Sequence, residues 1–281
     1  MNSICSSSTS GSLLVSGASG ALARQVIELL LRHRPHQPII ATTRQPHKLD
    51  DLAARGVSVR FADFDQPDSL DIAIKGASRM LLVSTNTPDV PPRRSIQHGN
   101  AIEAAWRCGV QHVVYTSFAT AGAAQPSPIA ADHAATERKL RQGQTGFSIL
   151  RNAIYAELLL ASLPLACRSG QLPCAQGHGR MTLVARADCA AAAAAALMDG
   201  FDGRRVLSVA GEEALDAHAL ASLASEVLNT RIEALETPSD QFEAAWIKCG
   251  ALPGMPTFSP LWTAALQRAK WRSQSATCAS C

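Results

Sequence analysis

The sequence predicts an α/β fold built on a doubly wound parallel sheet of the Rossmann type, with a small α/β lobe towards the C-terminus. Between residues 13 and 155, short apolar runs alternate six times with amphipathic segments, as in parallel strands joined by crossover helices. One run, Met80–Ser84, is almost entirely apolar, as expected for a central strand covered on both faces. A chain of 281 residues, 47% of them hydrophobic, is long enough to bury such a core.

Apolar spacing places the elements of this sheet in chain order. Strands are expected at 13–15, 39–43, 57–61, 80–84, 112–117 and 147–150, and helices at 21–31, 49–55, 68–74, 94–108 and 130–142. Further strands at 182–185, 206–209 and 231–235 are expected to form the small lobe. Asp68 and Asp188 are expected to cap the helices that begin beside them.

The first expected strand ends in a glycine turn that opens the first helix. Gly17 permits a tight turn, Gly20 lets backbone approach a ligand closely, and Ala23 is small enough for helix and strand to pack. The unpaired amides and positive dipole end of such a helix suit the pyrophosphate of a dinucleotide. Glycines and serines also make ordinary turns, so the position between strand and helix gives the pattern most of its weight.

The end of the second strand indicates which dinucleotide is preferred. Arg44 ends the strand and Lys48 follows one turn later, with no acidic residue between Leu31 and Leu49. An acid at this place holds the ribose 2′-OH of NADH, whereas an arginine accommodates the 2′-phosphate of NADPH. The sequence therefore favours NADPH over NADH, with an ordinary surface arginine as the alternative. Asp63, just after the third strand, is expected either to accept from the adenine amino group or to cap the next turn.

Composition argues against several other classes of protein. A formal net charge of +3, with both signs mixed along the chain, argues against a nucleic-acid surface. No stretch reaches the roughly 18 uninterrupted apolar residues of a membrane span. Residues 1–12 lack the basic start and apolar core of a signal peptide, so a cytoplasmic protein is expected. The eight cysteines are expected to be free thiols, Cys278 and Cys281 included, and no metal site is predicted.

Several stretches together resemble the NmrA-like branch of the atypical short-chain dehydrogenases, particularly bacterial NADPH:quinone oxidoreductases and triphenylmethane reductases. The His-x-x-x-Glu of 133–137 and the Arg-Asn-x-x-Tyr of 151–155 carry most of this resemblance. The other matching stretches are 15–22, 41–44, 61–64, 97–100, 112–117 and 185–188. Two departures from the family pattern stand out: Ala23 replaces the third glycine, and residues 251–281 do not look like the family's C-terminal segment.

The resemblance implies roles for particular residues and a division of the chain. It implies that the pyrophosphate lies against Gly17, Ala18, Ser19, Gly20, Ala21 and Leu22, the 2′-phosphate meets Arg44, the cofactor runs along Ser84, Thr85 and Asn86, and Asn152 to Glu157 flank the nicotinamide. We expect a flexible N-terminus (1–12), an NADP-binding Rossmann domain (13–155), remaining Rossmann elements with a substrate lobe (156–250) and a divergent segment (251–281).

The Tyr-x-x-x-Lys motif, which activates tyrosine as a proton donor in many short-chain dehydrogenases, is missing. The fourth residue after Tyr115 is Ala119, and the fourth after Tyr155 is Leu159. The resemblance favours Tyr155 and Asn152 for positioning the substrate or nicotinamide, although Tyr155 can instead pack on the sheet. His133 is expected either to donate a proton or to pair with Glu137 on the same helical face. Tyr115 is at least as well explained by core packing, and His98 by a structural role.

These residues predict an NADPH-dependent oxidoreductase that passes hydride to a quinone or a similar conjugated, electron-poor acceptor. Such acceptors do not require the strong general acid that an ordinary ketone needs. A non-catalytic NADP(H)-binding redox sensor is one alternative, and a biosynthetic ketoreductase or isomerase that uses His133 or Tyr155 as acid is another. The expected partner is a small aromatic or quinone-like substrate, with no nucleic acid or membrane, and a homodimer is compatible with the sequence.

Overall fold

The computed structural model describes residues 11–33, 35–85, 93–124, 127–160, 162–177, 179–238 and 240–249. They form two compact units. The first contains the described residues up to Ala121 together with Ala130–Ala153 and Val184–Val209, and the second contains Gly122–Ile129, Ile154–Leu183 and the described residues from Ala210 onward. The expected N-terminal segment, apart from Gly11 and Ser12, and the expected segment 251–281 lie outside the described residues.

The first unit is built on a parallel sheet of seven strands in the order β10-β6-β5-β4-β1-β2-β3. The strands are β1 (Ser12–Val15), β2 (Ile39–Thr43), β3 (Ser58–Phe61), β4 (Ala77–Leu82), β5 (His112–Phe118), β6 (Gly146–Asn152) and β10 (Arg204–Val209). The chain winds outward from β1 in one direction to β3, then returns to β4 and winds the other way. This order confirms the predicted doubly wound sheet and puts its switch point between β1 and β4.

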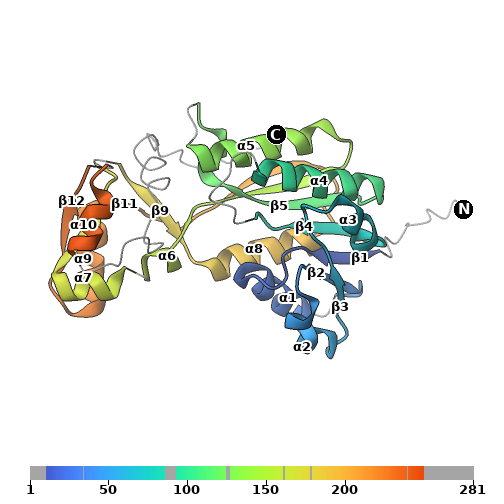
Figure 1. The fold of residues 1–281 in the computed structure, drawn as a ribbon, viewed down its shortest axis with the longest axis horizontal. Coiled ribbons are helices and arrows are strands. Elements are labelled where there is room, and N and C mark those ends of the chain that lie inside the picture. Colours follow the sequence, from blue (N-terminus) through green and yellow to red (C-terminus); the bar gives the residue numbers. More distant parts are fainter. Residues whose placement is uncertain are drawn as a thin grey trace, which may run out of the picture. The chain divides into compact units, whose positions relative to one another are not determined.

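Helices cover both faces of this sheet (Figure 1). One face carries α3 (Pro67–Ile74), α4 (Arg93–Arg107) and α5 (Pro128–Gln142), and the other carries α1 (Ala21–His33) and α8 (Arg186–Met198). Leu14, Met80 and Val113 belong to the core under α3 and α4. Their neighbours in sequence point to the opposite face, because side chains alternate along a strand. Short helices follow β2, as η1 (Pro46–Leu49) and α2 (Asp50–Ala53), and β5, as η2 (Ala119–Gly122).

Three expectations about elements are wrong. Asp68 lies inside α3, whose N-cap is Gln66, because Pro67 starts the helix one residue earlier. Asp188 lies inside α8, whose N-cap is Ala185, so both acids act on the first turn of a helix without capping it. Residues 206–209 belong to β10 of the main sheet rather than to the small lobe, because β10 pairs along its whole length with β6.

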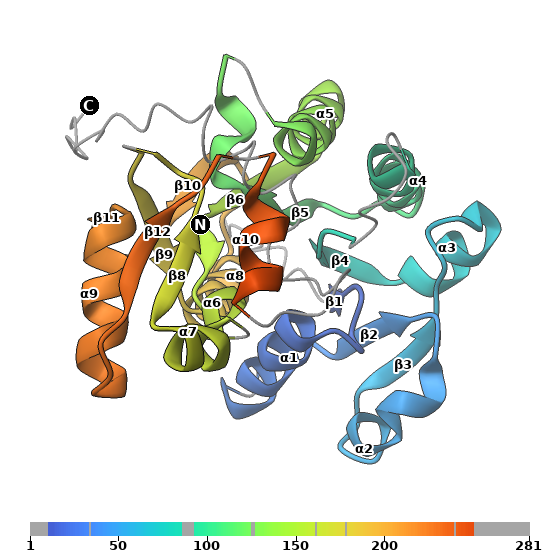
Figure 2. The same cartoon turned by 60° about the vertical axis from the view of Figure 1, so that its left-hand side comes forward.

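The second unit combines small sheets with short helices (Figure 2). The sheets are β11-β9-β7, from Ala214–Leu215, Met181–Val184 and Ile154–Tyr155, and β12-β8, from Glu233–Glu236 and Gln171–Cys174. The helices are α6 (Glu157–Leu160), α7 (Leu163–Ser169), α9 (Ala217–Leu228) and α10 (Phe242–Lys248). Asp216 caps α9 by accepting a hydrogen bond from the Ala219 amide at 2.8 Å. Leu172, Leu220 and Trp246 belong to the separate core of this unit.

Candidate functional site

The turn after β1 has the geometry for which glycine is required. Gly17 has a φ of +62°, a conformation that residues with a side chain adopt only at a cost. The Gly20 amide donates to the Gly17 carbonyl at 2.8 Å, and a Cβ added at Gly20 would lie only 3.2 Å from that carbonyl oxygen. Ala23 is completely buried, as a small residue between helix and sheet should be. The turn therefore brings the first amides of α1, which have no acceptor within the helix, to one end of the sheet.

A cavity of about 350 Å³ lies beyond the carboxyl ends of β1 to β4. This volume is in the range of small-molecule sites, and the cavity adjoins the switch point, where open α/β sheets bind their ligands. The residues that line it are Gly17, Ser19, Gly20, Thr42, Thr43, Arg44, Gln45, Ala62, Asp63, Phe64, Val83, Ser84, Thr85 and Gln97.

Many of the residues predicted to bind the coenzyme line this cavity, and others do not. Gly17, Ser19, Gly20, Arg44, Asp63, Ser84 and Thr85 are among the lining residues. Ala18 and Leu22 have buried side chains, and Ala21 is the exposed first residue of α1. Asn86 lies outside the described residues. For Ala18, Ala21 and Leu22 a role through backbone amides stays a prediction.

Asp63 and Gln97, which both line the cavity, form hydrogen bonds with Asp65. Asp63 accepts from the Asp65 amide at 3.0 Å, which is the turn-capping bond expected as the alternative to adenine binding. Gln97 donates through Nε2 to Asp65 at 2.9 Å, and Arg93 donates to the same carboxylate oxygen at 2.7 Å. The hydrogen bond from Arg93 is the main cause that lowers the pKa of Asp65.

Because an ionised carboxylate only accepts, the amide of Gln97 must turn its nitrogen towards Asp65. Its Oε1 is then buried with no partner in the part of the chain that the structure describes. The glycine turn and the cationic Arg44 together fit the pyrophosphate and the 2′-phosphate of a phosphorylated dinucleotide.

His133 and Glu137, although both on α5, have different partners. Nδ1 of His133 lies 2.7 Å from the hydroxyl of Tyr115, which is completely buried in the core. His133 is itself only 5% exposed, and burial, helped by the charge of Arg94, lowers its pKa to about 3. Glu137 instead accepts from Arg151 at 2.9 and 2.8 Å and from the Ser117 hydroxyl at 2.8 Å. The expected alternative of a His133–Glu137 ion pair is therefore wrong.

Asn152 and Tyr155 fall into different units. Asn152 ends β6 in the first unit and its side chain is buried, whereas the half-buried Tyr155 ends β7 in the second unit. Neither lines the cavity at β1 to β4. Their expected roles beside the nicotinamide stay predictions.

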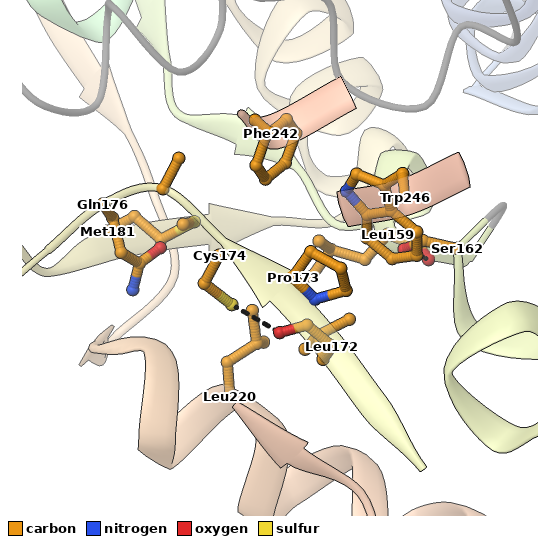
Figure 3. Close-up of a pocket in the computed structure, with 11 residues that line it drawn as sticks. Leu159, Ser162, Leu172, Pro173, Cys174, Gln176, Met181, Leu220, Phe242 and Trp246 are labelled. Carbon is orange, nitrogen blue, oxygen red and sulfur yellow. Dashed lines mark hydrogen bonds between the residues drawn. The ribbon is translucent and has the colours of Figure 1, made fainter. Parts of the chain in front are cut away.

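A smaller cavity of about 30 Å³ lies inside the second unit, with Cys174, Phe242 and Trp246 among its lining residues (Figure 3). The buried thiol of Cys174 donates to the Leu172 carbonyl at 3.4 Å, and burial raises its pKa to about 12, so it is no thiolate nucleophile at neutral pH. Trp246 Nε1 and Gln176 Nε2 have no partner among the described residues. A cavity of this size has room for one or two water molecules and is too small for an aromatic ring.

Comparison with known proteins agrees with the geometry of the first unit. Residues 17–200 match the model of a family described as NAD(P)H-binding. The chain belongs to this family. Quinone oxidoreductase 2 of Escherichia coli is 33% identical over 243 residues, which cover 86% of this chain and 84% of the relative. An NmrA-like family domain-containing oxidoreductase of Aspergillus flavus is 29% identical over 236 residues, covering 82% and 75%.

Solved structures with a similar fold include those of two reductases. The triphenylmethane reductase of Citrobacter sp. in complex with NADP(H) has a TM-score of 0.84 at 29% identity, covering 93% of this chain and 92% of that one. The NADPH-dependent quinone oxidoreductase of Escherichia coli in complex with NADPH has a TM-score of 0.83 at 31% identity, with the same coverage. These matches confirm the NmrA-like resemblance, the Rossmann-type fold, the NAD(P)H cofactor and the expectation of an oxidoreductase.

The described residues contain neither a membrane-spanning helix nor a metal-binding cluster. Over the described ranges, no helix has the length and apolar character that a bilayer crossing demands. Within the same ranges, no three His, Cys, Asp or Glu side chains are grouped so that they could hold a metal ion.

Proposed function

We propose that this protein is an NADPH-dependent reductase that transfers hydride to a quinone or a similar conjugated, electron-poor acceptor. The proposal rests on family membership and on the cavity beyond β1 to β4. It is supported by the names of two relatives, a quinone oxidoreductase and a triphenylmethane reductase. Bound in this cavity, NADPH would supply the hydride, and the residues of the chain would hold and orient it.

The preference for NADPH over NADH is supported by the charge at the end of β2. Arg44 is exposed and lines the cavity directly after this strand. A guanidinium at this place can form two charge-assisted hydrogen bonds with a 2′-phosphate. The carboxylate that would hold a free ribose 2′-OH is missing from the segment between Leu31 and Leu49.

The proton donors of the chain indicate the nature of the acceptor. The chain has two tyrosines and neither is followed by lysine at the fourth position. Burial raises the pKa of Tyr115 far above its usual value, and Tyr115 is completely enclosed. His133 is buried and neutral at pH 7. Tyr115 and His133 are therefore poor proton donors to a substrate.

The rate contribution that a general acid would make indicates which class of substrate can react without one. A positioned general acid is worth about 10²–10⁴ in rate, or roughly 3–5 kcal/mol of barrier. An unactivated ketone needs this contribution, because hydride addition leaves a basic alkoxide. A quinone gives a stabilised hydroquinone anion that takes its proton from water, and a cationic dye needs no proton. The chain's remaining task is then to hold the reactants together in the right orientation.

The test is a comparison of acceptors with the purified full chain. We expect NADPH, followed through its nicotinamide absorbance, to be consumed with benzoquinones and cationic triphenylmethane dyes and not with simple cyclic ketones. Faster consumption with ketones would favour the ketoreductase alternative. Tight NADPH binding without turnover of any acceptor would favour the redox sensor.

We also propose that Asn152 and Tyr155 position the nicotinamide or the acceptor, and that the protein works as a cytoplasmic homodimer. A Tyr155→Phe variant should raise KM for the quinone more than it lowers kcat. An unchanged KM would argue instead that Tyr155 only packs. Light scattering of the purified chain tests the dimer.

A further inference from the structure

The segment that leaves β4 has its backbone fixed by side chains. β4 ends at Leu82, so the residues that follow have no sheet ladder. The amide of Val83 donates to the Ser16 hydroxyl at 2.9 Å and that of Ser84 to the Thr116 hydroxyl at 2.8 Å. The amide of Thr85 donates to Nε2 of His98 at 3.0 Å. Three consecutive residues that line the cavity are thus held from three different places, the turn after β1, β5 and α4.

Thr85 makes further contacts through its carbonyl and its hydroxyl. Its carbonyl accepts from Nε of Arg94 at 2.9 Å, and its hydroxyl lies 3.3 Å from the same nitrogen of His98. Arg94 and His98 are one turn apart on α4, so a single face of that helix fixes both polar groups of the Thr85 backbone. His98 is completely buried, and its position therefore depends on its neighbours rather than on solvent.

The neighbours of His98 also determine which of its nitrogens carries the proton. Thr136 donates its hydroxyl hydrogen to the Asp132 carbonyl at 3.0 Å, so its oxygen must accept from Nδ1 of His98, which lies at 2.9 Å. Nε2 is then free to accept from the Thr85 amide. Two independent hydrogen bonds therefore require the same neutral tautomer, with the proton on Nδ1.

The charge state of His98 agrees with this tautomer. Burial, followed by the neighbouring His133 and the charge of Arg94, holds the pKa of His98 well below its usual value. The hydroxyl of Tyr115 also lies near Nδ1, at 3.4 Å. His98 thus stays a neutral acceptor for the Thr85 amide throughout the neutral pH range.

We propose that His98 is a positioning residue for the coenzyme, which acts by holding Thr85 in the conformation that forms one wall of the binding cavity. This inference rests on the proposed coenzyme site, and His98 itself does not line the cavity. Because Thr85 is already ordered in the free protein, coenzyme binding does not incur the entropic cost of ordering this part of the wall. Loss of the Nε2 acceptor would leave the Thr85 amide without this partner and the wall less well ordered.

Two substitutions distinguish the roles of the two ring nitrogens of His98. A glutamine side chain extends to the ε position, so His98→Gln keeps an oxygen acceptor for the Thr85 amide. An asparagine side chain extends only to the δ position, so His98→Asn keeps a polar group for Thr136 and loses the acceptor. Each variant gives up one buried hydrogen bond, and both should therefore lower the Tm by similar amounts.

The measurement is the Kd of NADPH for the full-length wild type and both variants, by calorimetric titration, with Tm recorded in parallel. We expect Kd of His98→Asn to exceed that of His98→Gln by about tenfold, the change that losing one buried hydrogen bond produces. Equal Kd values for the two variants would overturn the inference while leaving the coenzyme site intact. A wild type that does not bind NADPH would overturn both the inference and the proposed function.

A measurement on the wild type covers the case in which a variant does not fold. The nitrogen chemical shifts of His98 report its tautomer, and we expect Nδ1 to be protonated and Nε2 to be an acceptor. We also expect the amide signal of Thr85 to exchange slowly with solvent before NADPH is added. A proton on Nε2, or a Thr85 amide that is protected only after NADPH binds, would contradict the inference.

Discussion

Gly17 is the residue on which the turn after β1 depends most, because its φ of +62° is costly for any residue with a side chain. We predict that Gly17→Ala lowers stability by about 1–2 kcal/mol and also weakens NADPH binding, measured as Kd. Gly109 is the matched control, since it has a φ of +73° with open space around it and does not line the cavity. Gly109→Ala should cost similar stability and leave Kd unchanged. Equal effects on Kd would contradict a special role of Gly17.

Arg44 is the residue predicted to determine the preference for NADPH over NADH. Replacing it with alanine removes the charge-assisted bonds to a 2′-phosphate, worth about 1.5–3 kcal/mol. We predict that Arg44→Ala weakens NADPH binding by about tenfold or more and changes the Kd of NADH little. Arg32→Ala removes the same charge from the last turn of α1 and should spare both constants. Parallel weakening of both coenzymes by Arg44→Ala would contradict the assignment.

Residues whose type alone indicates their role can be predicted from the sequence. Gly17, Arg44 and Asp63 each lie within two residues of the end of a strand, and all three line the cavity. Phe64 and Gln97 were not predicted as lining residues. Gln97 enters the cavity wall from α4, and only the tertiary packing of α4 beside β4 brings it there, although the 97–100 stretch did carry part of the family resemblance.

Among the elements, α8 depends on a buried charge from the sheet. Arg79 of β4 donates to the carbonyls of Leu197 at 2.8 Å and Ala196 at 3.1 Å, in the last turn of α8, and to that of Phe201 at 3.1 Å. These bonds satisfy carbonyls that have no partner within the helix. Because α8 packs against α1, the cap also supports the helix that opens the coenzyme site.

We predict that Arg79→Met destabilises the protein by roughly 3 kcal/mol, because several buried acceptors lose their donor. Unfolding in urea measures this change. Arg107→Met is the matched control, since Arg107 pairs with Asp71 on the surface and is about half exposed. That substitution should cost less than about 1 kcal/mol. Similar losses in both variants would show that the Arg79 cap contributes little.

Elements with a clear apolar pattern were predicted well, and elements without one were missed. The expected strand at 39–43 coincides with β2, and the expected strand at 112–117 falls one residue short of β5. β7 and β11 have two residues each, too few to show any periodicity. β8 contains Pro173, which argues against a strand in a sequence because proline donates no ladder bond.

For the whole molecule, buried histidines predict a loss of stability in acid. Burial is the largest cause that lowers the pKa of His112 to about 4 and that of His133 to about 3. The unfolded chain takes up protons on these rings as the pH falls through about 6.5, whereas the folded chain does so only near those lower values. The unfolded state thus binds more protons between these limits, and stability falls as the pH falls.

We predict that each of these histidines contributes about 1.4 kcal/mol of lost stability per pH unit below about 6.5. Urea unfolding at pH values from 7 down to 5 measures the slope. His133→Gln should reduce the slope by about one such contribution. A stability that does not change over this range would contradict the burial of neutral imidazoles.

The sequence predicts the sheet of the first unit as a whole better than the division of the later chain. Alternating strands and helices indicate a doubly wound sheet, and the order of its strands agrees. Residues 206–209 were wrongly assigned to the lobe, because local apolar spacing marks a strand without indicating the strand with which it pairs. β10 lies at the edge of the main sheet and leaves Val206 and Leu207 about 40% exposed.

The proposed function requires that the turn after β1 and the cavity beside it hold a phosphorylated nicotinamide coenzyme. Calorimetric titration of the purified full chain with NADPH and with NADH measures this binding. We expect saturable binding of NADPH, with a lower Kd than that of NADH. An absence of binding for both coenzymes would show that the site does not hold a nicotinamide coenzyme.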